Sequence, residues 1–174
     1  MTFLLLLISC GSEIPSTTTN PVDKLAGYED VRLGRALEDV PGLERLPKDD
    51  VYAMKETAYT RPADDTMYTP PGGEVVHTEG PPVYVIRDGV VRSIKLRVID
   101  DVRIDYATDK MTKESRFDCT VLLYNLNKTL GKPSTEVDSA GTNYTWLGDL
   151  SKISVLVMDG TEGDKNCFLR TRML

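Results

Sequence analysis

The chain has 174 residues and contains few of the residue types that common catalytic and metal sites require. His77 is the single histidine, so a catalytic triad or a histidine-based metal site would have to use it. It lies in a stretch rich in proline and glycine, which predicts a surface histidine without a function. The sequence also lacks the Gly-x-Ser-x-Gly nucleophile motif and the Gly-Lys-Ser/Thr phosphate loop. No catalytic residue, metal ligand or cofactor is therefore predicted.

Positive charge is scarce as well, because 21 lysines and arginines stand against 27 aspartates and glutamates, a formal net charge of -6. A protein that binds nucleic acid needs a basic surface to neutralise phosphates, so nucleic acid is excluded as the expected partner. Long apolar runs are also missing. A membrane-spanning helix takes about 20 apolar residues, and the N-terminal run Phe3–Ile8 is far too short for that.

That short N-terminal run is nevertheless informative, because it ends in Leu7-Ile8-Ser9-Cys10. A short apolar region that closes on small residues is typical of an export signal. The next ten residues are mainly Gly, Ser, Pro, Thr and Asn, a composition that predicts a flexible tether. The motif at Cys10 resembles the lipobox of bacterial lipoproteins, in which the cysteine is lipidated and becomes the new N-terminus.

This resemblance implies how the chain is divided and where it works. Residues 1–9 would be a removed signal peptide, 10–24 the lipidated Cys10 with its tether, and 25–174 the globular body. The lipid on Cys10 would attach the protein to a membrane of the bacterial cell envelope. Because Gly11 and Ser12 rather than Asp follow Cys10, the sorting pattern of such lipoproteins implies the outer membrane, facing the periplasm.

Two cysteines remain once Cys10 is set aside. Cys119 and Cys167 form an even pair in an oxidising compartment, which favours a disulfide. Such a bridge would close a loop of about 48 residues and contribute about 4 kcal/mol in the chain-entropy model. The alternative is two buried thiols, since free cysteine is often fully buried.

The pattern of apolar residues predicts an α+β body, with an antiparallel sheet packed against one long helix and a short N-terminal helix. The long helix is expected over about 110–131 and ends at Gly131. Its apolar face is expected around Phe117, Val121 and Tyr124, widened by Leu122, Leu123 and Leu126. The short helix is expected within residues 23–47 and a long loop over 61–82. Strands are expected at 51–60, 83–87, 90–99, 144–147, 153–158 and 167–173, with Asp88-Gly89 as a hairpin turn.

Two similarities concern the organisation of the body. A weak similarity of sequence pattern between its two halves suggests two related modules, 25–106 and 107–174. The helix, Leu-Gly-x-Pro at 130–133, the Tyr-x-Trp strand at 144–146 and the strands after it resemble the small SmpA/OmlA-type lipoproteins of outer-membrane assembly. The tandem arrangement also resembles secreted β-lactamase inhibitor proteins. Both resemblances imply a non-enzymatic module that binds another protein.

Cations alternate with apolar residues in two of the expected strands. Lys95 and Arg97 lie in the 90–99 strand, and Arg170 and Arg172 lie in the last one. Because successive side chains point to opposite faces of a strand, each pair would share a face. If both strands belong to one sheet, the four cations form a basic surface that binds an acidic envelope protein or an anionic envelope polymer. The alternative is an ordinary sheet face whose cations pair with neighbouring Glu and Asp.

Acidic residues leave two further possibilities open. The runs Asp100–Asp109 and Asp159–Asp164 contain oxygen ligands of the kind that Ca²⁺ prefers, but a turn between strands explains the second run without metal. An envelope hydrolase could use a pair of carboxylates that the sequence does not identify. The leading expectation is a non-enzymatic binding or assembly module; the alternatives are that hydrolase and an inhibitor or immunity protein.

Overall fold

The computed structural model describes residues 13–15, 17–47, 56–61, 67–70, 73–101, 104–105, 107–108, 110–111, 115–160 and 164–174. The expected signal peptide and Cys10 therefore lie outside the described residues. Ile14 is buried in the core, and Pro21–Lys24 form helix α1. Packed residues thus begin before the expected boundary at residue 25.

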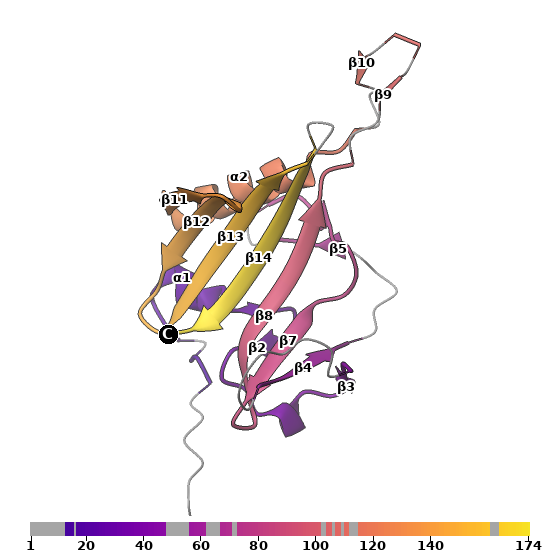
Figure 1. The fold of residues 1–174 in the computed structure, drawn as a ribbon. Helices are drawn as coiled ribbons and strands as arrows, with labels where there is room; N and C mark the ends of the chain where they lie inside the picture. Colours follow the sequence, from indigo (N-terminus) through magenta and orange to yellow (C-terminus); the bar gives the residue numbers. More distant parts are fainter. Residues whose placement is uncertain are drawn as a thin grey trace, which may run out of the picture.

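An antiparallel sheet dominates the structure (Figure 1). Within the described residues it has eight strands, in the order β11-β12-β13-β14-β8-β7-β4-β3. Their bounds are β3 Glu44–Arg45, β4 Glu56–Thr60, β7 Val83–Arg87, β8 Val90–Ile99, β11 Ser134–Asp138, β12 Gly141–Leu147, β13 Ser151–Asp159 and β14 Lys165–Met173. The expected antiparallel sheet is therefore confirmed.

The remaining elements are small, apart from one helix. Three two-stranded pairs are formed by β1 Gly27–Tyr28 with β2 Val31–Arg32, β5 Met67–Tyr68 with β6 Val76–His77, and β9 Ile104–Asp105 with β10 Lys110–Met111. A 3-10 turn covers Leu37–Asp39, and α2 covers Asp118–Leu130. Helix α2 packs on β8 and β14 and α1 packs on β13, all on one face of the sheet (Figure 1). The core lies between this face and these elements.

The β7–β8 hairpin forms where the sequence predicts it, with β7 at Val83–Arg87 and β8 at Val90–Ile99. Its turn residues Asp88 and Gly89 have φ angles of 54° and 75°. Positive φ at both central residues matches the right-handed twist of the flanking strands, which is why an Asp-Gly pair favours this turn. The last three expected strands are present too, each with a few more residues than predicted.

Helix α2 corrects the expected long helix in both length and orientation. It begins at Asp118, while Lys110–Met111 form strand β10. The expected apolar face was wrong at Tyr124, which is 64% exposed, and at Phe117, which is 40% exposed. It was right at Leu122 and Leu126, which are buried together with Cys119 and Asn125.

The physical reason for the helix start lies at the end of β8. Asp100 is buried, and its Oδ1 accepts a hydrogen bond of 2.8 Å from the backbone N–H of Cys119. A carboxylate at this place satisfies one of the free N–H groups of the first turn and favours the positive end of the helix dipole. Because this cap comes from 19 residues upstream, no local pattern could indicate it.

Other departures from the expected elements occur in the N-terminal half and at the sheet edge. The helix expected within 23–47 is replaced by α1, the 3-10 turn and short strands, since Gly34 and Gly42 have positive φ angles that interrupt helical geometry. The expected 61–82 loop contains the β5–β6 pair. Edge strand β11 was not expected, because all five of its residues are exposed and none forms an apolar face. Of the expected 51–60 strand, the structure describes β4, and 51–55 lie outside the described residues.

Strands from both halves of the chain belong to the same sheet. β8 from the first half pairs with β14 from the second, and the core cluster contains residues from both halves. Helix α2 is also linked to the C-terminal strands, because the indole Nε1 of Trp146 donates a 2.8 Å hydrogen bond to the carbonyl of Gly131. The division into two related modules remains a prediction.

Cys119 and Cys167 form a disulfide, with their Cα atoms 5.7 Å apart. The bond joins the first turn of α2 to β14, and both residues are fully buried. The two cysteines that the sequence predicts to pair therefore lie at disulfide distance. Together with the Asp100 cap, the disulfide fixes which side of α2 faces the sheet.

A buried carboxylate also attaches α1 to the sheet. Asp23 is 0% exposed, and its oxygens accept hydrogen bonds from Ser151 Oγ at 2.6 Å, Asp149 N at 3.0 Å and Leu150 N at 3.2 Å. These donors belong to the β12–β13 turn. The contact is close, because a Cβ atom added to Gly148 would lie 2.3 Å from Asp23 Oδ1.

Replacing Asp23 with alanine should lower the free energy of unfolding by about 3 kcal/mol, because it leaves buried backbone N–H groups without an acceptor. Chemical unfolding in urea measures the change. Asp39→Ala removes the same charge from an exposed position and should change the free energy by less than about 0.5 kcal/mol. Equal effects of the two substitutions would contradict the structural role of Asp23.

Removing the disulfide should destabilise the protein by about 4 kcal/mol, since the bond restricts a loop of about 48 residues in the unfolded chain. The measurement compares urea unfolding of the wild type and of Cys119→Ala/Cys167→Ala, each with and without a reductant. The reductant should lower the stability of the wild type alone. If both cysteines of the unreduced, unfolded wild type react with a thiol reagent, the disulfide is refuted.

Candidate functional site

The four cations predicted to share a surface lie on neighbouring strands. In the β14–β8 pairing, Arg170 lies opposite Lys95, Arg172 opposite Ser93 and Arg97 opposite Phe168. All four cations are exposed. Their alternating neighbours are buried, such as Leu96, Val98 and Leu169. The cations therefore lie on the face of the sheet opposite α1 and α2, and we call Lys95, Arg97, Arg170 and Arg172 the basic face.

Ion pairing accounts for one cation of the basic face. Arg97 pairs with Glu79, and its guanidinium carbon lies 5.5 Å from the centre of the Phe168 ring. Arg170 donates from Nε to Ser93 Oγ at 3.1 Å. Within the described part of the chain, Lys95, Arg170 and Arg172 make no ion pair. The alternative of a fully paired sheet face thus describes Arg97 but not the other three cations.

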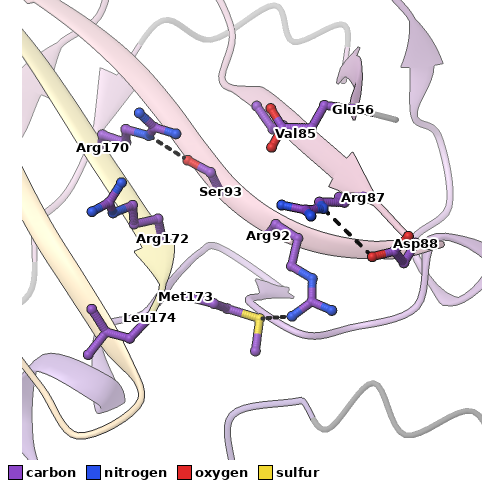
Figure 2. Close-up of a pocket in the computed structure, with 10 residues that line it drawn as sticks. All are labelled: Glu56, Val85, Arg87, Asp88, Arg92, Ser93, Arg170, Arg172, Met173 and Leu174. Carbon is purple, nitrogen blue, oxygen red and sulfur yellow. Dashed lines mark hydrogen bonds and ion pairs between the residues drawn. The ribbon is translucent and has the colours of Figure 1, made fainter. Parts of the chain in front are cut away.

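A cavity of about 420 Å³ opens on this side of the sheet, beside the end of β14 (Figure 2). We call it the arginine cavity, because four of its ten lining residues are arginines. It is lined by Glu56, Val85, Arg87, Asp88, Arg92, Ser93, Arg170, Arg172, Met173 and Leu174. The β4, β7, β8 and β14 strands thus all contribute to its wall.

Two of these arginines were not expected at the site, namely Arg87 and Arg92. For Arg92 the reason is an irregularity in the β7–β8 pairing, in which Val85 pairs with Ser93 while the next residue, Ile86, pairs with Val91. Arg92 is the extra residue of this β-bulge. A bulge breaks the two-residue alternation and changes the direction of a side chain, so the alternation used for the basic face could not assign Arg92. No local sequence signal marks this bulge.

The guanidinium groups of the cavity differ in what they contact (Figure 2). Arg87 Nε lies 3.7 Å from Asp88 Oδ2, a contact at the exposed surface. Arg92 is half-buried; its Nη1 donates to Met173 Sδ at 3.5 Å, and its buried Nε has no hydrogen-bond partner among the described residues. Arg172 has neither a hydrogen bond nor an ion pair within the described residues. Three of the four arginines therefore lack a carboxylate partner in the described part of the chain.

A second cavity, of about 220 Å³, lies farther along the same two strands. Its wall is largely apolar and includes Pro81, Val83 and Phe168. Arg170 lines both this cavity and the arginine cavity. The open face therefore combines cations with an exposed aromatic ring, a composition found at the centres of protein interfaces.

Titratable groups also gather at the start of α2. His77 Nδ1 lies 3.5 Å from Asp118 Oδ1, and Arg116 Nε lies 3.5 Å from Asp118 Oδ2. Burial raises the pKa of the Asp100 carboxyl, and the nearby charge of Asp118 acts in the same direction. His77, expected as a surface residue, is partly exposed and contacts Asp118. Asp100 caps the helix, and none of these four residues lines either cavity of the open face.

The acidic runs have structural partners where the structure describes them. Asp100 caps α2, and the Asp101 carboxylate lies 3.5 Å from Arg116. In the second run Gly160 N donates to the Asp164 carbonyl at 2.8 Å, while 161–163 lie outside the described residues. Among described residues, no group of three His, Cys, Asp or Glu side chains is arranged to hold a metal ion.

Comparisons with known proteins complete the description of the site. Family models, curated proteins and solved structures yield no match to this chain. Among the described residues, no helix has the length and apolar character needed to cross a membrane. The geometry and charge of the open sheet face are therefore the observations that bear on function.

Proposed function

We propose that this chain is a non-enzymatic binding module of the bacterial cell envelope, and that its basic face binds an anionic partner. The observation that supports this most directly is the set of exposed cations on one sheet face, three of which lack an acidic partner among the described residues. The partner is an acidic envelope protein or an anionic envelope polymer. The basic face supplies the contact, and the arginine cavity adjoins it at Arg170 and Arg172.

The charge distribution supports binding rather than simple solvation. The whole chain has a formal charge of -6, yet this face concentrates positive charge on two neighbouring strands. Such asymmetry steers an oppositely charged partner and raises its association rate. Solubility alone would not require several cations to lie together on two neighbouring strands.

The rigidity of the face also favours binding. β14 and β8 are interior strands of the sheet, each hydrogen-bonded on both sides, and the disulfide joins β14 to α2. A surface that is already ordered loses less conformational entropy when a partner binds. Arg97 and Phe168 add an exposed cation–aromatic contact, of a kind enriched in binding hot spots.

The attachment and location of the module are part of the same proposal. Lipidation of Cys10 would hold the body at the outer membrane, facing the periplasm, as the lipobox resemblance implies. The tether would then be the segment between Cys10 and the first packed residue described, Ile14. The resemblance to SmpA/OmlA-type and inhibitor-like modules and the division into two related modules also remain proposals.

Two other functions remain predictions from the sequence, an envelope hydrolase and an inhibitor or immunity protein. For the hydrolase, the described carboxylates whose charges influence each other include Asp100 and Asp118. Asp100 accepts a hydrogen bond at the start of α2, and Asp118 contacts His77 and Arg116. The geometry therefore favours a structural role for this pair and favours the binding module overall.

Reversing charge on the basic face should abolish capture of the partner. Arg170→Glu/Arg172→Glu, in the lipidated protein, should retain less than one-tenth of the envelope material that the wild type retains, because attraction becomes repulsion across the interface. Quantitative mass spectrometry of material captured from the native envelope measures this.

A matched control separates the basic face from total charge. Arg45→Glu/Lys132→Glu makes the same charge change at exposed residues outside the basic face, and capture should stay within about twofold of the wild type. Equal capture by wild type and by Arg170→Glu/Arg172→Glu would refute the proposed function.

Cys10→Ala should release the protein from membranes, because a lipid-anchored protein without its acylated cysteine keeps no comparable apolar anchor. Fractionation of cells into membrane and soluble pools measures the distribution. Ser9→Thr, if it is still processed, changes a neighbouring residue and leaves the lipid site in place. Continued membrane retention of the Cys10→Ala protein would contradict lipid anchoring.

A further inference from the structure

The arginine cavity has a specific chemical character within the basic face. We propose that it binds a phosphate group, and that this phosphate is the part of the anionic partner that the module recognises. The identity of the partner rests on the proposed function, whereas the choice of phosphate as the ligand rests on the lining residues of the cavity and their charges. It adds a site and a ligand class to a surface that the sequence predicted only as basic.

Charge matching favours phosphate over a carboxylate. Among its side chains, the cavity wall has four guanidinium groups against the two carboxylates of Glu56 and Asp88, so positive side-chain charge is in excess. A phosphomonoester carries about -1.5 to -2 at pH 7, whereas one carboxylate carries a single negative charge. A bound phosphate therefore offers these guanidinium groups more negative charge and more acceptor oxygens than one carboxylate does.

Arg92 supplies an independent observation. Its guanidinium is half-buried in the cavity wall, its Nε is buried without a partner, and its Nη1 contacts a thioether sulfur, which is a weak acceptor. A partly desolvated charge without an acidic partner is costly. Among the described residues no carboxylate contacts Arg92. Because its guanidinium points toward Met173, which packs against the core, Arg92 adds unpaired positive charge at the cavity wall without a direct contact to the anion that Arg170 and Arg172 would hold.

Arg170 and Arg172 are placed to hold the same group. They are two positions apart on β14, so that their Cα atoms are about 7 Å apart and their side chains leave the same face. Ser93 Oγ accepts from Arg170 Nε at 3.1 Å and so orients that guanidinium. The Nη groups stay available for the bidentate geometry that arginine forms with phosphate oxygens.

The direct test is titration of the purified, oxidised protein with inorganic phosphate, followed by calorimetry at constant ionic strength. We expect saturable binding at least tenfold tighter than that of acetate. Arg172→Gln should weaken phosphate binding about tenfold, since a hydrogen bond to a charged group has at least that effect, and Arg92→Gln, which removes a charge from the wall without a direct contact, should weaken it less. Arg45→Gln removes an equal charge outside the cavity and should change affinity by less than twofold.

Conservative variants distinguish recognition from folding. Arg172 is exposed, so Arg172→Gln should keep the thermal unfolding midpoint of the wild type while losing phosphate affinity. Arg172→Lys keeps the charge but loses the forked geometry, and should fall between wild type and Arg172→Gln. The proposal is overturned by non-saturable phosphate binding, by equal affinities in all variants, or by an acidic peptide that binds more tightly than phosphate.

A second arm identifies the source of the phosphate. Flotation of the Cys10→Ala protein with phosphatidylcholine vesicles, with and without one-tenth phosphatidic acid, tests a lipid phosphate. Flotation that needs both phosphatidic acid and Arg172 supports the phosphate site and assigns a lipid. Phosphate binding without flotation supports the same site and assigns a soluble or polymeric phosphate.

The two sets of experiments distinguish failure of the phosphate site from failure of the proposed function. If Arg170→Glu/Arg172→Glu loses its envelope partner but the wild type binds no phosphate, the phosphate site is refuted and the binding module stands. If phosphate binds as expected while capture is insensitive to these residues, the proposed partner contact through the basic face is refuted.

Discussion

The antiparallel pairing of β14 with β8 is the constraint on which the rest of the structure depends. It joins the hairpin of the first half to the C-terminal strands, and it forms the middle of the sheet. The same register directs Leu96 and Leu169 into the core and Lys95 and Arg170 to the open face. A shift of one residue would exchange the two sets, which burial of unpaired cations forbids.

Buried polar contacts and one disulfide keep the helices on the opposite face. Asp100 and the Cys119–Cys167 bond fix the start and the orientation of α2, while Asp23 holds α1 against the β12–β13 turn. Each carboxylate is satisfied by backbone or hydroxyl donors, so burial does not leave it without partners. These contacts cover one face of the sheet, and the face available for binding is therefore the cationic one.

Prediction from the sequence succeeded where the signal was local. The β7–β8 hairpin follows from β-branched runs on both sides of Asp88-Gly89, whose turn geometry is a property of those two residues. Prediction of the buried face of α2 was right for Leu122 and Leu126 but wrong for Tyr124 and Phe117, which are apolar enough to suggest burial yet are exposed. The packing of the helix depends on Cys119 and on Asp100. These residues are 19 positions apart in the sequence, so no local pattern contains both of them. Edge strand β11 was missed because it has no buried face.

The candidate site likewise has some features that local sequence predicts and others that depend on tertiary packing. The sequence by itself determined that Lys95 and Arg97 share one side of their strand and that Arg170 and Arg172 share one side of theirs, because side chains alternate with a period of two. Only the tertiary structure decided that the two sides coincide and that Arg92, at a bulge, lines the adjoining cavity. Ser93 and Arg170 meet across 77 residues of sequence, and pairing at that distance depends on which register fills the core, a property of the whole chain rather than of any segment.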